Sequence, residues 1–169
     1  SNVESEQAYE ACSRPVAGGG GLHEIDLYLT VRRCSGLESG LYRYDPQDHQ
    51  LLRINELNAA CKQLLVEACH GALLTGEPDI LITLAARYGR VTWKYEGMPY
   101  ALILKHVGVI YQHLYLVATA LGMAPCGLGA GNSETFAQAT GLDRFAHIPV
   151  GEFILGRPAD IKQESCKSH

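Results

Sequence analysis

The chain has 169 residues, of which 47% are hydrophobic; this is enough to bury one substantial core and too little for two full domains. The 14 Lys and Arg residues stand against 18 Asp and Glu residues, and the formal net charge of -4 comes with no concentrated basic block. This balance argues against nucleic acid or an anionic membrane as the main partner and favours a small molecule or a peptide.

Residues 4–12 are predicted to form a short helix that ends before Arg14, because proline at position 15 disfavours helical geometry in the residue before it. A glycine run follows, made of Gly18, Gly19, Gly20 and Gly21. It leads into residues 25–31, which are rich in β-branched and aromatic side chains and are therefore predicted to form a strand.

Turn residues at 37–40 introduce a predicted partner strand over residues 41–44, which Asp-Pro closes. In residues 56–70 the apolar side chains recur at helical spacing, which indicates an amphipathic helix. Residues 79–86 form a short apolar run of the kind found in a fully buried strand.

Residues 98–121 are predicted to form the longest helix, since apolar side chains fall at three- and four-residue steps and the opposite face is also largely apolar. Such a helix needs cover nearly all round, and burial in a dimer is one way to provide it. The segment is too polar to span lipid; its interruptions are Lys105, His106, Gln112 and His113.

Residues 125–129 are predicted to form a strand with reduced side chains, residues 133–139 a short helix capped by Ser133, and residues 150–155 a final strand. Because helices and strands alternate, the expected fold is α+β, with a central mixed sheet flanked by helices. A single domain over residues 1–169 is expected, with a polar tail at residues 161–169.

Six cysteines are scattered along the chain without a CxxC pair and without a secretory leader before them, so they are interpreted as thiols of a cytoplasmic protein. They are Cys12, Cys34, Cys61, Cys69, Cys126 and Cys166. Zinc ligation is the disfavoured alternative. His106 and His113 lie seven residues apart with no third ligand between them, so they are interpreted as core or interface histidines, and no metal site is predicted.

Three segments carry the candidate chemistry, and each has a plainer alternative. In residues 14–22 the bare glycine backbone could approach a ligand ring or phosphate while Arg14 pairs with the phosphate; the alternative is a flexible linker. In residues 90–95 Lys94 beside Tyr95 could transfer a proton; from residue types alone, a solvated turn is the favoured alternative. Residues 122–131 could lie flat against a ligand, or could pack closely on a neighbouring helix.

Taken together, these segments resemble the SagB/ThcOx family of FMN-dependent dehydrogenases within the nitroreductase-like flavoproteins, over about residues 14–158. The segments that carry the resemblance are the glycine loop with residues 22–24, and residues 40–46, 90–95, 106–108, 122–129 and 150–152. Their order and spacing carry the resemblance better than any one of them does.

The resemblance implies an FMN-binding fold that forms a homodimer with two flavins at the subunit interface. It also implies that Lys94 and Tyr95 are the catalytic pair that removes a ring proton while hydride passes to the flavin N5, which turns a thiazoline or oxazoline into the azole, and that oxygen then reoxidises FMN. The implied partners are a peptide or carrier-bound azoline substrate and a cyclodehydratase. The implied cofactor-binding residues are Arg14, Gly18, Gly19, Gly20, Gly21, Leu22, Cys126, Gly127, Leu128, Gly129 and Arg157.

The sequence departs from the family at two places. Gly18 stands where related enzymes commonly have serine, and little precedes Arg14, so the chain is expected to be a fragment or shortened form of a larger protein. Two other functions compete with azoline dehydrogenation. One is a general NAD(P)H-dependent nitro or quinone reductase, and the other is a degenerate dimerisation module that has lost its flavin.

Overall fold

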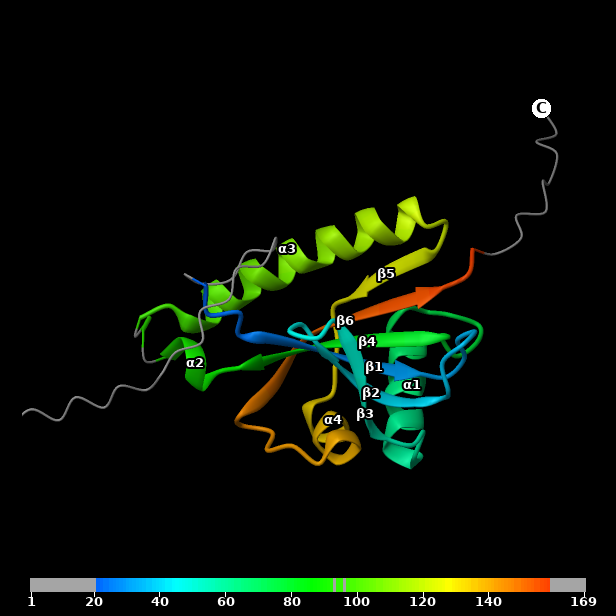
Figure 1. Cartoon of the computed structure of the whole chain (residues 1–169), viewed down its shortest axis with the longest axis horizontal. Helices are drawn as coiled ribbons and strands as arrows, with labels where there is room; N and C mark the ends of the chain where they lie inside the picture. The colour runs from blue at the N-terminus through cyan, green and yellow to red at the C-terminus, as the bar shows by residue number, and fades with distance from the viewer. Residues whose placement is uncertain (1–20, 93, 96, 159–169) are drawn as a thin grey trace, which may run out of the picture.

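The computed structural model describes residues 21–158 except 93 and 96, and in this part of the chain one six-stranded sheet carries helices on both faces (Figure 1). The strands are β1 (Ile25–Val31), β2 (Gly40–Asp45), β3 (Gln50–Asn55), β4 (Ile80–Arg87), β5 (Ala124–Leu128) and β6 (His147–Gly156). The helices are α1 (Ala59–Gly71), α2 (Gly89–Thr92), α3 (Pro99–Ala120) and α4 (Ser133–Thr140). The α+β class predicted from the sequence is confirmed.

The described strands run in the order β3-β2-β1-β4-β6-β5, and each neighbouring pair is antiparallel. The expectation of a mixed sheet was therefore wrong for these strands. Helices α2 and α3 carry the chain from β4 to β5, which point the same way, but β6 lies between them and opposes both. A crossover that often produces adjacent parallel strands produces none here.

The predicted elements recur with small shifts at their ends. Helix α1 begins at residue 59 rather than 56, because the Asn58 side chain caps it by accepting a hydrogen bond from the Cys61 backbone amide at 2.9 Å. Helix α4 is capped by Asn132, not by Ser133 as predicted, since the Asn132 side chain accepts from the Glu134 and Thr135 amides. Residues 4–12 and 161–169 lie outside the described residues.

Two elements were not predicted from the sequence. Strand β3 is an edge strand paired with β2, and five of its six residues are exposed, so it lacks the alternation of apolar and polar residues that marks a half-buried strand. Helix α2 has only four residues, too short for a periodic signal.

Two apolar cores lie on opposite faces of the sheet. Helices α1 and α4 pack against each other on one face, where the core residues include Tyr28, Leu65 and Phe136. Helix α3 crosses the other face over β5 and β6, and its core residues there include Ile103 and Val107 (Figure 1). The sheet thus separates two layers that can serve different purposes.

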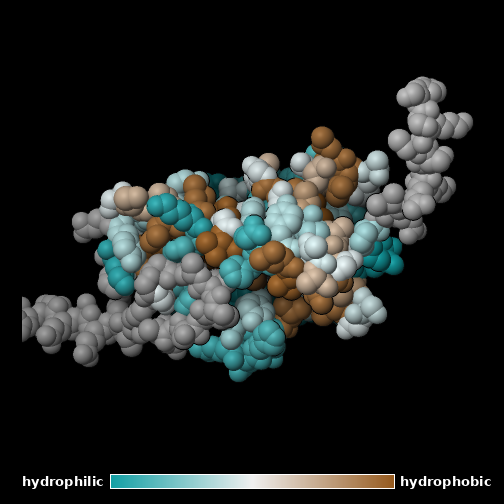
Figure 2. Space-filling model, turned by 90° about the horizontal axis from the view of Figure 1, so that it is seen from above, coloured by the Kyte–Doolittle hydropathy of each residue, from teal (hydrophilic) through white to brown (hydrophobic). Residues whose placement is uncertain are grey.

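Helix α3 is covered on one side only. Among its residues Ile103, His106, Val107 and Ala118 are buried. Its exposed large apolar residues are Tyr100, Leu104, Tyr115, Leu116 and Val117, and Met98 and Leu121 flank it. Figure 2 looks onto this side of the molecule and shows apolar residues gathered there among polar ones. The expectation that this segment is too polar to span lipid was wrong: by length and composition α3 could cross a membrane, and 22% of its most apolar window is buried within the chain.

Candidate functional site

The start of β1 and the segment around α2 lie together at one end of the sheet. Arg90 donates through Nη1 to the backbone oxygen of Leu22 at 3.4 Å, and Arg87 donates through Nη2 to that of His23 at 3.1 Å. Leu22 is fully buried, and Gly21 adopts a φ of 83°, in the region that favours glycine. The first two segments singled out from the sequence are therefore brought together.

Lys94 and Tyr95 follow α2 in a turn that is held by the buried Val91. The amides of both residues donate to the Val91 backbone oxygen, at 3.2 and 3.0 Å. Lys94 is exposed, while Tyr95 is half-buried against the α3-side core. The Lys94 Nζ lies 5.7 Å from the centre of the Tyr95 ring. The pair thus presents a cation and a phenol side by side at the surface, anchored by a packed backbone.

A cavity of about 220 Å³ opens beside this end of the sheet. Its charged lining consists of Arg43, Arg87 and Arg90 against Asp26 and Asp45. Arg87 and Asp26 form an ion pair at 3.2 Å. Because the arginines outnumber the carboxylates, this cavity favours an anionic ligand group.

The third segment singled out from the sequence, residues 122–131, lies along the edge strand β5 under α3. The Gly127 amide donates to the Tyr115 hydroxyl at 2.7 Å, and a Cβ on Gly127 would lie 3.2 Å from the Tyr111 ring. Close packing on the helix, one of the two interpretations of this segment, therefore accounts for Gly127. At Gly129 a Cβ would meet no atom within 4 Å, so that backbone borders open space.

The two side chains in this segment that were predicted to contact the cofactor differ in exposure. The Leu128 side chain is buried in the core shared with α1 and α4, on the face away from α3. Cys126 is a half-buried free thiol. The cofactor contacts predicted for these residues stay predictions.

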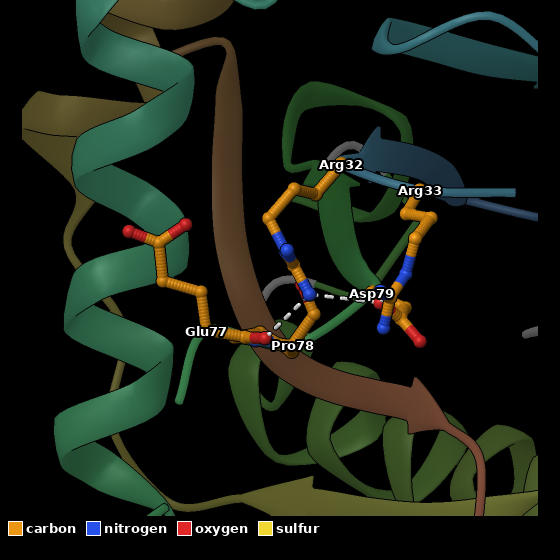
Figure 3. Close-up of polar contacts among 5 residues, drawn as sticks. All are labelled: Arg32, Arg33, Glu77, Pro78 and Asp79. Carbon is orange, nitrogen blue, oxygen red and sulfur yellow. Dashed lines mark hydrogen bonds and ion pairs between the residues drawn. The ribbon is translucent and has the colours of Figure 1, made fainter. Parts of the chain in front are cut away.

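Arg157 lies beside a second cavity of about 510 Å³, at the end of the sheet where β6 finishes and β5 begins. Arg33 also lines it and is held by Asp79, which accepts from Arg32 and Arg33 at 2.8 and 2.9 Å (Figure 3). Arg157 is exposed and has no ion-pair partner among the described residues. It is therefore available to a phosphate.

The cross-strand register fixes how far apart these two regions are. Gly127 faces Phe153, Phe153 faces Ile82, and Ile82 faces Leu29, whereas Leu22 precedes Leu29 by seven residues. At about 4.8 Å between strands and 3.3 Å per residue, Leu22 and Gly127 are roughly 20 Å apart or more. Within one chain Leu22 and Gly127 are therefore too far apart to border a common ring, whereas the placement predicted for the whole glycine run stays a prediction. Arg14, Gly18, Gly19 and Gly20 lie outside the described residues.

A buried polar pair holds the start of β1 against α3. Glu24 is 1% exposed and His106 is 7% exposed, and the Glu24 carboxylate contacts the His106 Nδ1. The sequence predicted a core or interface histidine at position 106 but not its partner. Glu152 was also not predicted as a site residue, although it lies in a segment that carries the family resemblance and a carboxylate within the apolar strand over residues 150–155 is a visible irregularity.

The family model for the nitroreductase family matches residues 5–157. A protein of Methanocaldococcus jannaschii that is named as a nitroreductase is 31% identical over 143 residues, which are 83% of this chain and 71% of that protein.

Solved structures show the same fold. One is the Escherichia coli microcin synthetase McbBCD complex with truncated pro-MccB17 bound, with a TM-score of 0.75 at 23% identity. The match covers 88% of this chain and 57% of the microcin synthetase chain. A nitroreductase-like structure from Anabaena variabilis gives a TM-score of 0.70 at 23% identity, over 83% of this chain and 28% of that one.

The chain thus spans little more than half of the microcin synthetase chain and under a third of the Anabaena chain. At these identities the solved structures show a shared fold only. The family model and the archaeal relative show the family to which the chain belongs. This chain belongs to the nitroreductase family.

Proposed function

We propose that this protein is an FMN-dependent oxidoreductase that dehydrogenates thiazoline or oxazoline rings of a modified peptide to thiazoles or oxazoles. Membership of the nitroreductase family supports an oxidoreductase. The observation that carries the finer assignment is the Lys94–Tyr95 pair, with Nζ 5.7 Å from the ring centre, on the segment that meets the start of β1. The fold shared with a peptide-bound microcin synthetase complex supports a peptide substrate and a synthetase partner.

The described residues suit FMN by their chemistry. Arg157 lies beside the cavity of about 510 Å³, has no ion-pair partner among the described residues, and would hold the phosphate. The open backbone at Gly129 would lie against the ring, and Leu22 would border the ring from the second chain of the dimer proposed below. Bound FMN would accept hydride at N5.

The chain's own part in the reaction is proton removal and positioning. Converting an azoline to an azole takes away one proton and one hydride, and the proton must reach a base. Lys94 or Tyr95 is that base, because both side chains of this turn carry a group that can accept a proton during the reaction. The buried Val91 fixes the backbone that carries both side chains, so the pair is held at one place relative to the sheet.

Two chains would complete the site. Helix α3 begins beside the Lys94–Tyr95 turn and ends at the loop leading to the cavity that holds Arg157. We propose a two-fold homodimer in which the exposed faces of two α3 helices, including Leu104, Leu116 and Val117, pack antiparallel. This pairing sets the Lys94–Tyr95 end of one chain beside Arg157 of the partner subunit. Residues that lie far apart within one chain would then meet across the dimer interface.

The test uses the full chain with FMN and an azoline-containing peptide. We expect a flavin absorption band in the protein and loss of two hydrogens from the peptide by mass spectrometry. Lys94→Ala and Tyr95→Phe should each slow azole formation by roughly 10²- to 10⁴-fold while flavin stays bound. Lys62→Ala, an exposed lysine on α1, is the matched control. Parent-rate turnover by both site variants would refute the assignment of the base.

A general NAD(P)H-dependent nitro or quinone reductase is the second candidate, favoured by the similarity to the archaeal protein named as a nitroreductase. Steady-state NAD(P)H consumption with a nitroarene or quinone, unaffected by Tyr95→Phe, would favour it over azoline oxidation. A colourless protein after incubation with FMN would instead favour the flavin-free dimerisation module.

A further inference from the structure

A third cavity, lined by both apolar and polar residues, lies on the face of the sheet opposite α3, between the sheet and helices α1 and α4. It measures about 280 Å³. Leu64, Ala68, Leu81 and Phe136 form its apolar wall, and Glu67, Thr83, Asn132 and Glu152 supply polar side chains. Among the described residues that line it, two are carboxylates and none is a cation.

Glu152 reaches this cavity from the middle of β6. The residue is 9% exposed, and its carboxylate forms no hydrogen bond or ion pair with the described residues. Its carboxylate lies against Gly131, where an added Cβ would come within 1.9 Å of Oε1. The glycine therefore leaves the space that the carboxylate fills.

Glu67 lines the same cavity from α1, and only one of its two carboxylate oxygens is hydrogen-bonded within the described residues. Its Oε1 accepts hydrogen bonds from Gln63, Asn132 and Thr135, at 3.1, 3.1 and 3.2 Å. Its Oε2 is buried and has no partner among the described residues. Two carboxylates with unused acceptor oxygens thus border one space.

Buried carboxylates without partners are costly, and proteins normally pair them. Burial raises the pKa of Glu152 to about 7, so near neutral pH it holds a proton that an incoming cation would displace. Within the described part of the chain, the elements that line the cavity bring no compensating charge: β4 contributes Leu81 and Thr83, and α4 contributes Phe136. Tyr28 of β1, in the same cross-strand row, has a raised pKa through burial and is a neutral phenol.

We propose that this cavity binds one guanidinium or alkylammonium group carried on a hydrocarbon stem. The carboxylates of Glu152 and Glu67 would take the cation, and Leu64, Leu81 and Phe136 would enclose the stem. The volume lies just below the roughly 300–1,000 Å³ of pockets that hold whole drug-sized ligands, which suits a side-chain-sized group. A guanidinium can donate to two carboxylates at once through its planar fork. The group could belong to an arginine of a peptide or to a free small molecule.

Calorimetric titration of the full chain with n-butylguanidinium at about pH 8, where Glu152 is ionised, tests the site. The neutral analogue n-butylurea is the ligand control. We expect binding of the cation alone, loss of at least about tenfold in affinity in Glu152→Gln, and a smaller loss in Glu67→Gln. Glu134→Gln, an exposed carboxylate on α4, should leave the affinity unchanged. Affinity should also fall about tenfold as the pH drops from about 8 to 6, because Glu152 takes up a proton.

Ala68→Leu, which fills the cavity from α1, is a second variant that should abolish binding without touching a carboxylate. Blocked peptides with arginine or citrulline separate the two sources. Tighter binding of the arginine peptide than of the free probe indicates a peptide, and the reverse indicates a small molecule; both support the site. No binding at all, equal binding of n-butylurea, or undiminished binding by Glu152→Gln would overturn it. None of these readouts depends on flavin or turnover, so they stand apart from the test of the proposed function.

Discussion

Replacing Glu152 by glutamine should make the protein more stable at alkaline pH and change its stability less at acidic pH. The folded chain raises the pKa of this carboxyl from 4.5 to about 7, because burial disfavours the charged form. Between these values the folded state holds a proton that the unfolded state has lost. The contribution of Glu152 to stability is therefore fully present below about pH 4.5 and is lost as the pH rises through about 7.

The size of the effect follows from the same values. At about 1.4 kcal/mol per pKa unit, the difference between 4.5 and about 7 amounts to roughly 3 kcal/mol. Glutamine keeps the shape of the protonated acid but cannot ionise. The variant should therefore gain about 2–3 kcal/mol over the parent between about pH 5 and pH 8.

Urea unfolding of both proteins at these two pH values measures the effect, with Glu134→Gln as a control on the exposed surface of α4. For Glu134→Gln, the difference from the parent in free energy of unfolding should be nearly the same at both pH values. The claim that this carboxyl is buried without a partner would be refuted by one result. In that result, the free energy of unfolding of Glu152→Gln differs from that of the parent by the same amount at both pH values, within about 0.5 kcal/mol.

Three further predictions address packing. Gly131→Ala should cost only about 0.5–1.5 kcal/mol in urea unfolding, because its Cβ would displace the end of the flexible Glu152 side chain toward the cavity, and Glu152→Ala should remove that cost; a loss that persists in the double variant would contradict the geometry. His106→Ala leaves the buried Glu24 carboxylate unpaired and should cost roughly 3–5 kcal/mol by the same method, whereas His113→Ala, on the exposed side of α3, should cost far less. Leu116→Asp with Val117→Asp should give monomers in light scattering, while Leu51→Asp on β3 should not; dimers that persist would exclude the α3 interface.

The fold could be predicted from the sequence where periodicity is strong. Strand β1 was predicted with its observed bounds because β-branched and aromatic residues stand between a glycine run and a turn. Helix α3 was recognised from apolar residues at three- and four-residue steps. Strand β3 was not predicted, because side chains on both of its faces are exposed and burial therefore imposes no apolar pattern on its sequence.

The arrangement of the site could be predicted only in part. The link between Leu22 and Arg90 joins two segments that the sequence had singled out. The distance of both from Gly127 depends on β6 entering the sheet between β4 and β5, and chain order does not reveal strand order. The cavity at Glu152 depends on which face of a strand meets α1, and alternation alone does not identify the covering helix.

Mixing two inactive variants tests most directly whether one site is built from two chains. One variant carries both Lys94→Ala and Tyr95→Phe, and the other variant carries Arg157→Ala. In a mixed dimer the intact Lys94–Tyr95 pair of one chain meets intact Arg157 of the partner subunit, so a statistical mixture should recover about a quarter of the parent's azoline-oxidising activity. Activity no higher than that of the separate variants, in mixtures shown to exchange subunits, would contradict the account.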